Sequence, residues 1–375
     1  MERTAELALM DELLDLKAKK SAFLDDTVAR NPVDHYVSEQ RFESERSAIL
    51  QGVPSVAAHI SELEEPGSFV RRDIAGLPVL LTHDKDCRIN AFLNVCRHRG
   101  TRLVEENTGC QHRFSCPYHA WTYSSAGDLL AAPHYDQGFS EEDKATLALR
   151  RLGCTVRFGF VWIYPIAMTD GQFDDFFKAI SDDLSVLGIE GMGIAAEHSE
   201  DWAANWKILV EGGLEAYHFK VAHRTTIGPY FENNLSSYQS FGPHIRSILP
   251  RATMAKLNPN ERETWQIREH ANILYTLFPN SSLLVQQDHI VWITQNAVAP
   301  DKTTIRVVTL APKDRLENRD HWQRNHDITC NTLNEDFEIG ASIQSTLKSG
   351  ANTDMLFGRF EGALDRFNKT VNSYL

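Results

Sequence analysis

Cysteine is scarce in this chain of 375 residues, and long apolar runs are missing. Six cysteines are too few for a disulfide framework in a chain of this length. No apolar run approaches the roughly 20 residues that an α-helix needs to cross a bilayer. The first residues mix acids with leucines (MERTAELALMDELLDLKAKK) and lack the basic and apolar regions of a signal peptide. We therefore expect a cytoplasmic protein with no membrane partner.

Basic charge is also in short supply. The 51 acidic residues exceed the 38 lysines and arginines, which gives a formal net charge of −13. Nucleic acids and anionic membranes favour a basic surface, so neither is expected as a partner. Flavin and nicotinamide fingerprints are missing as well, so electrons for any redox chemistry are expected to come from a separate protein.

Two of the cysteines stand beside histidines in a pattern that predicts a metal site. The chain holds Cys96-x-His98 and, after a loop, Cys116-x-x-His119. Two thiolates and two imidazoles suit either a closed zinc site or a [2Fe–2S] cluster with two histidine ligands. Zinc fingers usually take both cysteines from one turn and both histidines from a helix, whereas each pair here supplies one of each. The pair order therefore favours the [2Fe–2S] cluster. Free thiols with no catalytic role are expected at the remaining positions, Cys87, Cys110, Cys154 and Cys330.

The distribution of β-rich and helical segments predicts three parts and an α+β fold class. Residues 1–45 are expected to form helices, over about 1–20 and from 34 to 50, that pack on a larger domain. Residues 46–165 hold short β-rich runs between Gly and Pro, which is typical of a small all-β domain. Residues 166–375 mix both patterns, which predicts a helix-covered antiparallel sheet. The expected strands are 78–82, 89–95, 121–123, 156–164, 246–253, 273–278, 282–286, 290–298 and 303–311, and the expected helices are 171–187, 201–219 and 327–348.

A second candidate metal site lies in residues 201–223, DWAANWKILVEGGLEAYHFKVAH. On a helix, Glu215 and His218 are three apart and share a face. His218 and His223 are five apart, or roughly 140° around an undistorted helix, so the helix must end or bulge before His223. Two imidazoles and one carboxylate would form a facial triad that leaves open positions on ferrous iron.

The carboxylate is expected from residues 332–347, TLNEDFEIGASIQSTL. Asp336 falls on one helical stripe with Leu333, Ile339, Ile343 and Leu347, the face expected to point into the protein. A buried unpaired carboxylate is costly, and a metal removes that cost. Asp336 is therefore the predicted third ligand. The other acids fall on other faces of this helix or beyond it: Glu335, Glu338, Asp354 and Asp365.

These motifs resemble those of the Rieske non-haem iron oxygenases, in particular the alpha (terminal oxygenase) subunits of ring-hydroxylating oxygenases. Arg99-Gly100 and Pro117-Tyr118, which follow or lie within the two Cys/His pairs, are similar to the Rieske cluster motif. The resemblance in the second half rests on Asn205-Trp206-Lys207, Glu215-x-Tyr217-His218-x4-His223, and Glu335-Asp336 followed by Gln344.

The resemblance implies an all-β Rieske [2Fe–2S] domain over residues 46–165. It also implies a catalytic domain of the helix-grip type over residues 166–375, on which residues 1–45 pack. Cys96 and Cys116 would bind one iron of the cluster, and His98 and His119 would bind the other.

The same resemblance implies one mononuclear Fe(II) per chain, bound by His218, His223 and Asp336. It further implies that Glu215 carries electrons between the two centres in a homotrimer. Glu215 would do so by linking His218 to His119 of a neighbouring subunit.

The expected function is that of a terminal oxygenase in a multicomponent system. It would use O2 and electrons from a separate NAD(P)H-dependent reductase, with or without a ferredoxin. Glu215, where many members have Asp, resembles the carnitine-oxygenase branch, whereas Gly212 departs from the Asn that many members carry. Hydroxylation or oxidative demethylation of a small organic substrate is expected, with a quaternary ammonium compound as one candidate. Dihydroxylation of an aromatic ring is the alternative within this class, and a Rieske electron carrier without a second iron is the alternative from a different class.

Aromatic side chains are the candidates for lining a substrate pocket or forming a cation–π cage around a quaternary ammonium group. Most of them are expected in the core. They are Tyr217, Phe219, Tyr230, Phe231, Phe278, Trp292, Phe357 and Phe360.

Overall fold

The computed structural model describes residues 1–375 and divides the chain into two compact units. One unit is β-rich and comprises Leu50–Asp174 with the short segment Gly188–Gly191. The other comprises Met1–Ile49, Asp175–Leu187 and Met192–Leu375. The domain limits expected from the sequence, 1–45, 46–165 and 166–375, stay predictions.

The β-rich unit contains three small antiparallel sheets. Four strands pair in the order β5-β4-β3-β6, and three-stranded sheets have the orders β10-β11-β2 and β7-β8-β9. The bounds are β2 Ser55–His59, β3 Ser68–Ile74, β4 Leu77–His83, β5 Ile89–Leu93, β6 Thr108–Cys110, β7 Arg113–Ser115, β8 Thr122–Ser124, β9 Leu129–Ala131, β10 Gly153–Arg157 and β11 Phe160–Tyr164. The sequence prediction of one strand over 156–164 was wrong, because Phe158 and Gly159 both have positive φ, +53° and +76°, and form a two-residue hairpin turn.

The larger unit is built on a seven-stranded antiparallel sheet in the order β12-β18-β17-β16-β15-β14-β13. Its strands are β12 Met192–Trp202, β13 Ser237–Phe241, β14 His244–Pro250, β15 Ala271–Leu277, β16 Ser281–Val285, β17 Ile290–Ala299 and β18 Lys302–Pro312. The five inner strands match the apolar runs read from the sequence. The two edge strands, β12 and β13, were not predicted, because polar residues such as Glu197, Ser199 and Gln239 interrupt the pattern. Polar residues are common on exposed sheet edges, where they discourage pairing with other chains.

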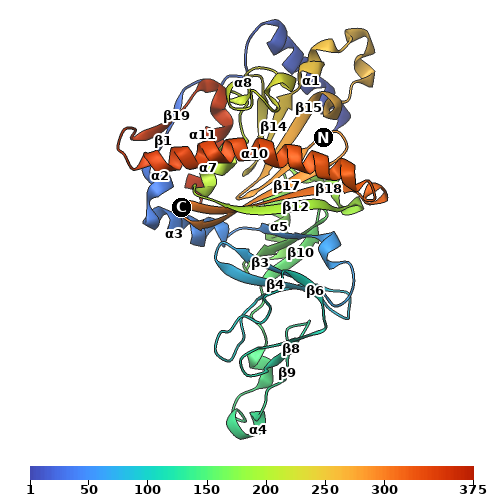
Figure 1. Ribbon diagram of the computed structural model, residues 1–375, viewed down its shortest axis with the longest axis vertical. Helices are drawn as coiled ribbons and strands as arrows, with labels where there is room; N and C mark the ends of the chain where they lie inside the picture. The colour runs from blue at the N-terminus through green and yellow to red at the C-terminus, as the bar shows by residue number, and fades with distance from the viewer. The chain divides into compact units, whose positions relative to one another are not determined.

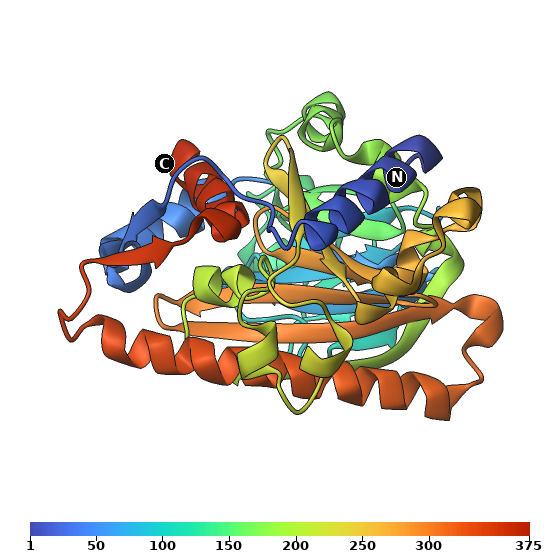
Figure 2. The same ribbon diagram turned by 90° about the horizontal axis from the view of Figure 1, so that it is seen from above.

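One long helix, α10 (Arg319–Leu347), lies against β12 and β18 (Figures 1 and 2). It begins before the predicted residue 327 because its first two turns are mostly polar and give no apolar period. The short helices are α4 Tyr135–Gly138, α5 Asp170–Phe177, α6 Ser181–Ser185, α7 Trp206–Glu211, α8 Phe219–Ala222 and α9 Ile267–His270.

The N-terminal and C-terminal segments of the larger unit are joined by strand pairing. Strand β1 (Ala29–Pro32) pairs antiparallel with β19 (Asp354–Phe357), and Figure 2 shows the blue and red segments together. Helix α1 (Arg3–Ala18) buries Leu7, Met10 and Leu13, as its apolar spacing predicts. The helix expected from 34 to 50 is instead divided into α2 (Asp34–Val37), α3 (Glu39–Glu45) and one π-helical turn. Helix α11 (Gly362–Ser373) ends the chain beside β13 and β14.

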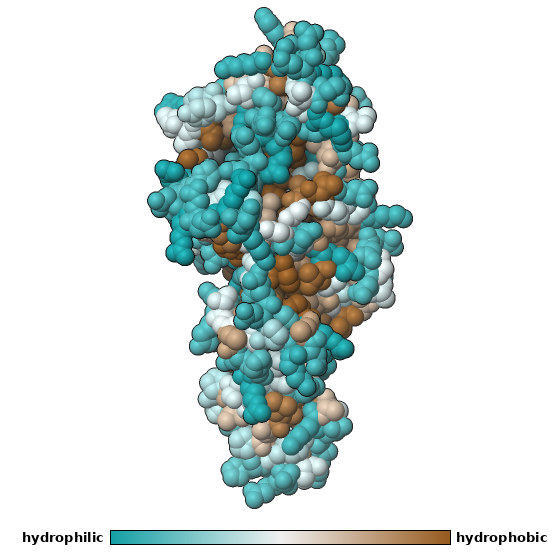
Figure 3. Space-filling model, turned by 90° about the vertical axis from the view of Figure 1, so that its right-hand side faces the viewer, coloured by the Kyte–Doolittle hydropathy of each residue, from teal (hydrophilic) through white to brown (hydrophobic).

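Figure 3 shows a face covered mainly by hydrophilic residues, with hydrophobic residues gathered in several separate groups. No helix combines the length and the apolar character that crossing a bilayer requires.

A buried polar network holds helix α7 against the N-terminal and C-terminal segments. The carboxylate of Glu45 accepts hydrogen bonds from the Lys207 ammonium, at 2.7 Å, and the Trp206 indole, at 3.0 Å. One turn later, Glu211 accepts from the Tyr36 hydroxyl and the Asn368 amide, each at 2.7 Å. Because a buried carboxylate without partners would be costly, these bonds fix the position of α7 in the unit.

Glu211 makes stability depend on pH. Burial raises the pKa of this carboxyl to about 7, from an ordinary value of 4.5. The folded chain therefore binds this proton more tightly than the unfolded chain does. The resulting contribution to the free energy of unfolding is fully present below about pH 4.5 and is lost as the pH rises through about 7. A shift of this size corresponds to about 3 kcal/mol.

We expect Glu211→Gln to remove this part of the pH dependence, because the amide keeps an oxygen for both hydrogen bonds and does not titrate. Urea denaturation between pH 5 and 8 gives the free energy of unfolding for the variant and the parent chain. Glu338→Gln, at an exposed position of α10, is the control and should follow the parent. Parallel curves for Glu211→Gln and the parent chain would contradict this role of Glu211.

Candidate metal centres

The first centre lies in the β-rich unit, where two loops of matching geometry present the Cys/His pairs. Cys96 follows strand β5 and Cys116 follows β7, and both thiols are buried. Each cysteine carbonyl accepts a hydrogen bond from the amide four residues later, Gly100 or Ala120, at 3.0 Å. These two residues both have positive φ, +83° and +54°, so each loop turns sharply at the same position.

The two histidines of this centre leave ring nitrogens free for a metal. The rings of His98 and His119 lie 4.7 Å apart, and Trp121 stacks on His98 at 4.9 Å. The Nδ1 atoms of both histidines are buried and have no hydrogen-bond partner. Buried polar atoms are rarely left unpaired in folded proteins, so the pair fits a bound metal centre.

The thiols of this centre also fit a metal. Burial raises the pKa of Cys96, and the adjacent Cys116 contributes to the same shift, so a thiolate pair is unfavourable without a compensating cation. The hydroxyl of Tyr123 lies 3.5 Å from the Cys96 sulfur and accepts a hydrogen bond from the Arg97 amide at 3.0 Å. By contrast, burial raises the pKa of Cys154 to about 12 and of Cys330 to about 11, which makes both poor nucleophiles at neutral pH.

The second centre lies in the larger unit and brings together three of the predicted residues. Single donor atoms of His218, His223 and Asp336 lie within 4.8 Å of one another. The two Nε2 atoms are 3.2 Å apart, and Asp336 Oδ1 is 3.3 Å from His218 Nε2 and 3.0 Å from His223 Nε2. Two imidazoles and a carboxylate around one point are the donor set of a 2-His-1-carboxylate iron site.

The backbone around the histidines differs in part from the sequence prediction. Helix α8 spans only Phe219–Ala222 and ends before His223, as the five-residue spacing requires. The single helix predicted over 201–219 was wrong: its start belongs to β12, Asn205 caps α7, and α7 ends at Glu211. Gly212 and Gly213 follow, and glycine lowers helix stability. Glu215 and His218 therefore meet across a non-helical turn.

Each imidazole of the second centre is held through its other nitrogen by a carboxylate. Glu215 is hydrogen-bonded to His218 Nδ1, and Glu335 lies 2.6 Å from His223 Nδ1. Thr226 donates a 2.6 Å hydrogen bond to Glu335, which fixes the carboxylate in turn. This arrangement leaves both Nε2 atoms directed at the same point, as carboxylates behind metal-bound histidines do.

Glu335 is the functional residue that the sequence reasoning missed, because only the third ligand was sought among these acids. The requirement for a carboxylate behind each histidine was the available signal. The stripe used to select Asp336 was also partly wrong, because Ile339 is 45% exposed. The buried face of α10 instead includes Phe337, Gly340 and Gln344, and Asp336 lies at its margin.

Electrostatics at the second centre favour a positive charge. Burial alone would lower the pKa of His218, but Asp336 and Glu215 raise it to about 10. Burial would raise the pKa of Asp336, but the two imidazoles hold it below its usual value. The two imidazoles, with three carboxylates around them, therefore bind protons tightly, and a metal cation would supply the same compensating positive charge.

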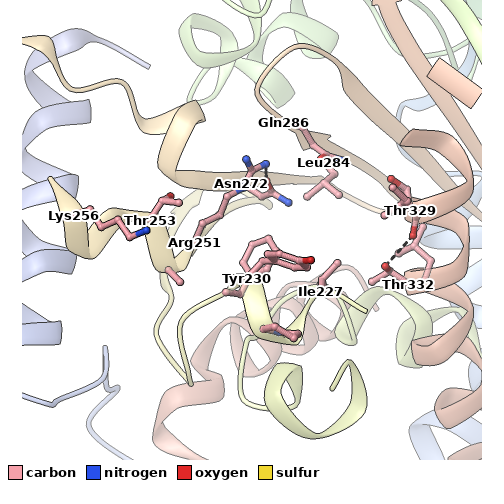
Figure 4. A pocket seen from close by; sticks show the side chains of 15 residues that line it. Ile227, Tyr230, Arg251, Thr253, Lys256, Asn272, Leu284, Gln286, Thr329 and Thr332 are labelled. Carbon is pink, nitrogen blue, oxygen red and sulfur yellow. Dashed lines mark hydrogen bonds between the residues drawn. The ribbon is translucent and has the colours of Figure 1, made fainter. Parts of the chain in front are cut away.

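Two adjoining cavities lie beside the second centre. The inner one, of about 90 Å³, is lined by His223, Asp336 and mainly apolar side chains, among them Phe219 and Phe231. The outer one, of about 530 Å³, is shown in Figure 4 and includes Tyr230. Of the aromatic residues considered in the sequence, these three line the cavities. Phe278, Trp292 and Phe357 are in the core, and Tyr217 packs on Phe360.

Comparison with known families identifies both halves of the chain. Residues 54–150 match the Rieske [2Fe-2S] domain. Residues 189–375 match the ring hydroxylating alpha subunit (catalytic domain). The chain therefore belongs to the Rieske non-haem iron oxygenases, whose cofactors are a [2Fe–2S] cluster and a mononuclear iron, and the first centre is not a zinc site.

Among characterised relatives, the chain is similar to oxygenase subunits that act on quaternary ammonium compounds. It is 32% identical over 197 residues to the carnitine monooxygenase oxygenase subunit of Acinetobacter pittii, covering 51% of this chain and 52% of that protein. It is 32% identical over 190 residues to the glycine betaine monooxygenase oxygenase subunit of Chromohalobacter salexigens, covering 51% and 42%. The chain thus matches only about half the length of these relatives.

The fold is similar to that of a solved quaternary ammonium Rieske monooxygenase, a structure described as giving insights into carnitine oxidation and inter-subunit electron transfer. The TM-score is 0.78 at 24% identity, with 92% of this chain and 96% of that chain covered. At this identity the likeness supports the fold.

We expect Cys116→Ser to lose the cluster while the second centre still binds iron, because a hydroxyl is a poor replacement for a thiolate at iron. Visible absorbance and the iron content of the purified protein measure the loss. Cys87→Ser, at an exposed thiol, is the matched control and should keep both. A normal EPR signal from the reduced cluster of Cys116→Ser would show that Cys116 is not a ligand.

Proposed function

We propose that this chain is the terminal oxygenase of a multicomponent system that hydroxylates or oxidatively demethylates a small organic substrate, with quaternary ammonium compounds as the first class to test. The observation that carries the proposal is the convergence of His218, His223 and Asp336, two of which, His223 and Asp336, line a cavity. The mononuclear iron, when bound, supplies the activation of O2 beside the substrate. Electrons would come from a separate NAD(P)H-dependent reductase, with or without a ferredoxin.

The side chains around the iron site would have separate tasks in this proposal. His218 and His223 would bind iron through Nε2 and Asp336 through a carboxylate oxygen. Glu215 and Glu335 would keep a proton on each Nδ1 and so hold both rings in the tautomer that presents Nε2. The apolar lining of the inner cavity would keep water from the reacting carbon and favour the alkyl part of the substrate.

We further propose that Cys96 and Cys116 bind one iron of the cluster and that His98 and His119 bind the other, in a cytoplasmic homotrimer. In such a ring, Glu215 would bond the partner subunit's His119 and order the path of the electron. The hydrogen bond between Glu215 and His218 supports one half of this bridge.

Two other functions remain as alternatives. Dihydroxylation of an aromatic ring needs the same iron ligands and is distinguished by the product. An electron carrier without a second iron is disfavoured, because it would not need three metal-type ligands and two orienting carboxylates at one point.

A panel of methylated amines and aromatic acids, turned over with a surrogate reductase, tests the activity. Release of formaldehyde indicates demethylation, and cis-diols indicate ring dihydroxylation.

We expect Asp336→Ala to lose the mononuclear iron and at least about 99% of turnover while keeping the cluster, because two imidazoles alone hold ferrous iron weakly. Iron analysis and cluster absorbance separate the two losses. Glu338→Ala, on the exposed side of the same helix, is the control. Survival of catalysis in Asp336→Ala would mean that another carboxylate, Glu335 first, is the ligand.

We expect Glu215→Ala to keep both metals but to pass electrons from the cluster to the mononuclear iron very slowly. The reason is that alanine removes the group that orders the path, whereas Glu215→Gln retains much of the hydrogen bonding. The measurement is product formed in a single turnover of pre-reduced protein, together with the rate of cluster reduction. A near-normal single-turnover product yield from Glu215→Ala would show that Glu215 has only a packing role.

A further inference from the structure

The outer cavity has a positively charged wall, and no acidic side chain lines this cavity to neutralise it. Arg251 and Lys256 line it, and the only carboxylate lining either cavity is Asp336 at the metal centre. Figure 4 shows Arg251 beside Asn272 on one side of the cavity, with Ile227, Leu284 and Thr332 around the remaining space. The wall therefore carries positive charge, which attracts an anionic group and repels a cationic one.

Arg251 is partly buried but forms no ion pair. Its side chain makes one hydrogen bond, from Nη2 to Asn272 Oδ1 at 2.6 Å. Arg246 on strand β14 is buried too, but Asp183 pairs with it. The negative charge of Asp288 attracts Arg251 electrostatically, but Asp288 does not line the cavity and is paired with His289 and His321. A guanidinium withdrawn from water without an anion is costly, and a ligand that brings one removes the cost.

The backbone fixes the place of this guanidinium. The amide of Arg251 donates to the His270 carbonyl at 2.7 Å, and Arg251 also forms an antiparallel bridge with Phe231. Asn272 lies on the neighbouring strand β15 and is buried. Because its Oδ1 accepts from Arg251, its Nδ2 is left to donate into the cavity. The remaining N–H groups of Arg251 and this amide form a donor set that matches a carboxylate.

The position of this donor set relative to the metal centre determines how a bound molecule would be oriented. The outer and the inner cavity adjoin, because they share the lining residues Asn272, Ile227, Phe231, Leu284, Thr332 and Leu333. The inner cavity continues along apolar side chains to His223 and Asp336. A molecule with an anionic group at Asn272 would thus extend its apolar or alkylated end toward the metal ligands.

We propose that Arg251, with the Asn272 amide beside it, binds the carboxylate of the substrate. The substrate is then a small carboxylic acid, zwitterionic or aromatic, and a carboxylate-free amine is a poor ligand. This proposal rests on the proposed function in taking the cavity beside Asp336 as the substrate site. Lys256 at the exposed rim adds a positive charge that attracts anions but is not part of the donor set.

Calorimetric binding to the iron-loaded protein tests this proposal with matched pairs of compounds. Glycine betaine is compared with choline, in which an alcohol replaces the carboxylate, and benzoate is compared with benzamide. The carboxylate compound of at least one pair should bind about 10- to 100-fold more tightly than its partner without a carboxylate, the range expected for a charge-assisted contact. The pair that shows the preference distinguishes a betaine from an aromatic acid. Equal or weaker binding of both acids would overturn the proposal.

Two variants act on the donor set in different ways. Arg251→Gln removes the charge, and Asn272→Asp places a carboxylate against Arg251 with little change of shape. Both variants should bind the carboxylate compound about 10- to 100-fold more weakly than the parent chain does. Asn272→Asp should also bind the neutral or cationic partner compound more tightly. Lys256→Gln is the control and should stay within about threefold of the parent.

The melting temperature and cluster absorbance of each variant verify folding. Acid binding that is unchanged in both folded variants would exclude Arg251 and Asn272 as the carboxylate site. Failure of the proposed function is separately visible, because a chain without mononuclear iron would fail iron analysis whatever its preference among ligands.

Discussion

The larger unit places three carboxylates, Glu215, Glu335 and Asp336, around two imidazoles, and this cluster needs a compensating positive charge. Two Nε2 atoms lie 3.2 Å apart, and a carboxylate oxygen lies within 3.3 Å of both. Since Glu215 and Glu335 hold the opposite nitrogens, both rings are constrained to direct Nε2 at the same point. A proton can stabilise this arrangement, which is why the pKa of His218 is raised to about 10. A divalent metal satisfies all three donor atoms at once.

The surrounding structure limits how far these side chains can move. Gly228 lets the chain pass close behind the second histidine, because a Cβ at this position would lie 2.7 Å from the His223 carbonyl oxygen. Helix α7 is anchored by the buried bonds of Lys207 to Glu45 and of Glu211 to Tyr36. Gln344 on α10 accepts a hydrogen bond from the backbone amide of Asn205, the residue that caps α7. The segment with the histidines and the helix with Asp336 are therefore joined by buried polar contacts, whose loss would be costly.

The sequence predicted the residues of the centres better than it predicted the backbone that holds them. Ligand spacing depends on chemistry, so Cys96-x-His98 and the histidines at 218 and 223 could be recognised without knowing the local fold. Helical periodicity was misleading at Trp202 and Glu215, because an edge strand and a turn carry spacings that a helix also allows. Glu335 was missed because its role depends on a contact with His223, 112 residues earlier in the chain. Arg251 could not be identified at all, since its lack of an ion pair is a property of the packed structure.

The two centres have different chemical demands, and their coexistence in one chain is what separates an oxygenase from an electron carrier. The most direct test is the ratio of iron to acid-labile sulfide in protein reconstituted without oxygen. A [2Fe–2S] cluster contributes two irons and two sulfides, and the mononuclear site contributes one more iron. We predict three irons and two sulfides per chain, with one iron removable by a mild chelator while the cluster absorbance stays. Two irons and two sulfides, with no further iron taken up at His218, His223 and Asp336, would contradict the oxygenase assignment.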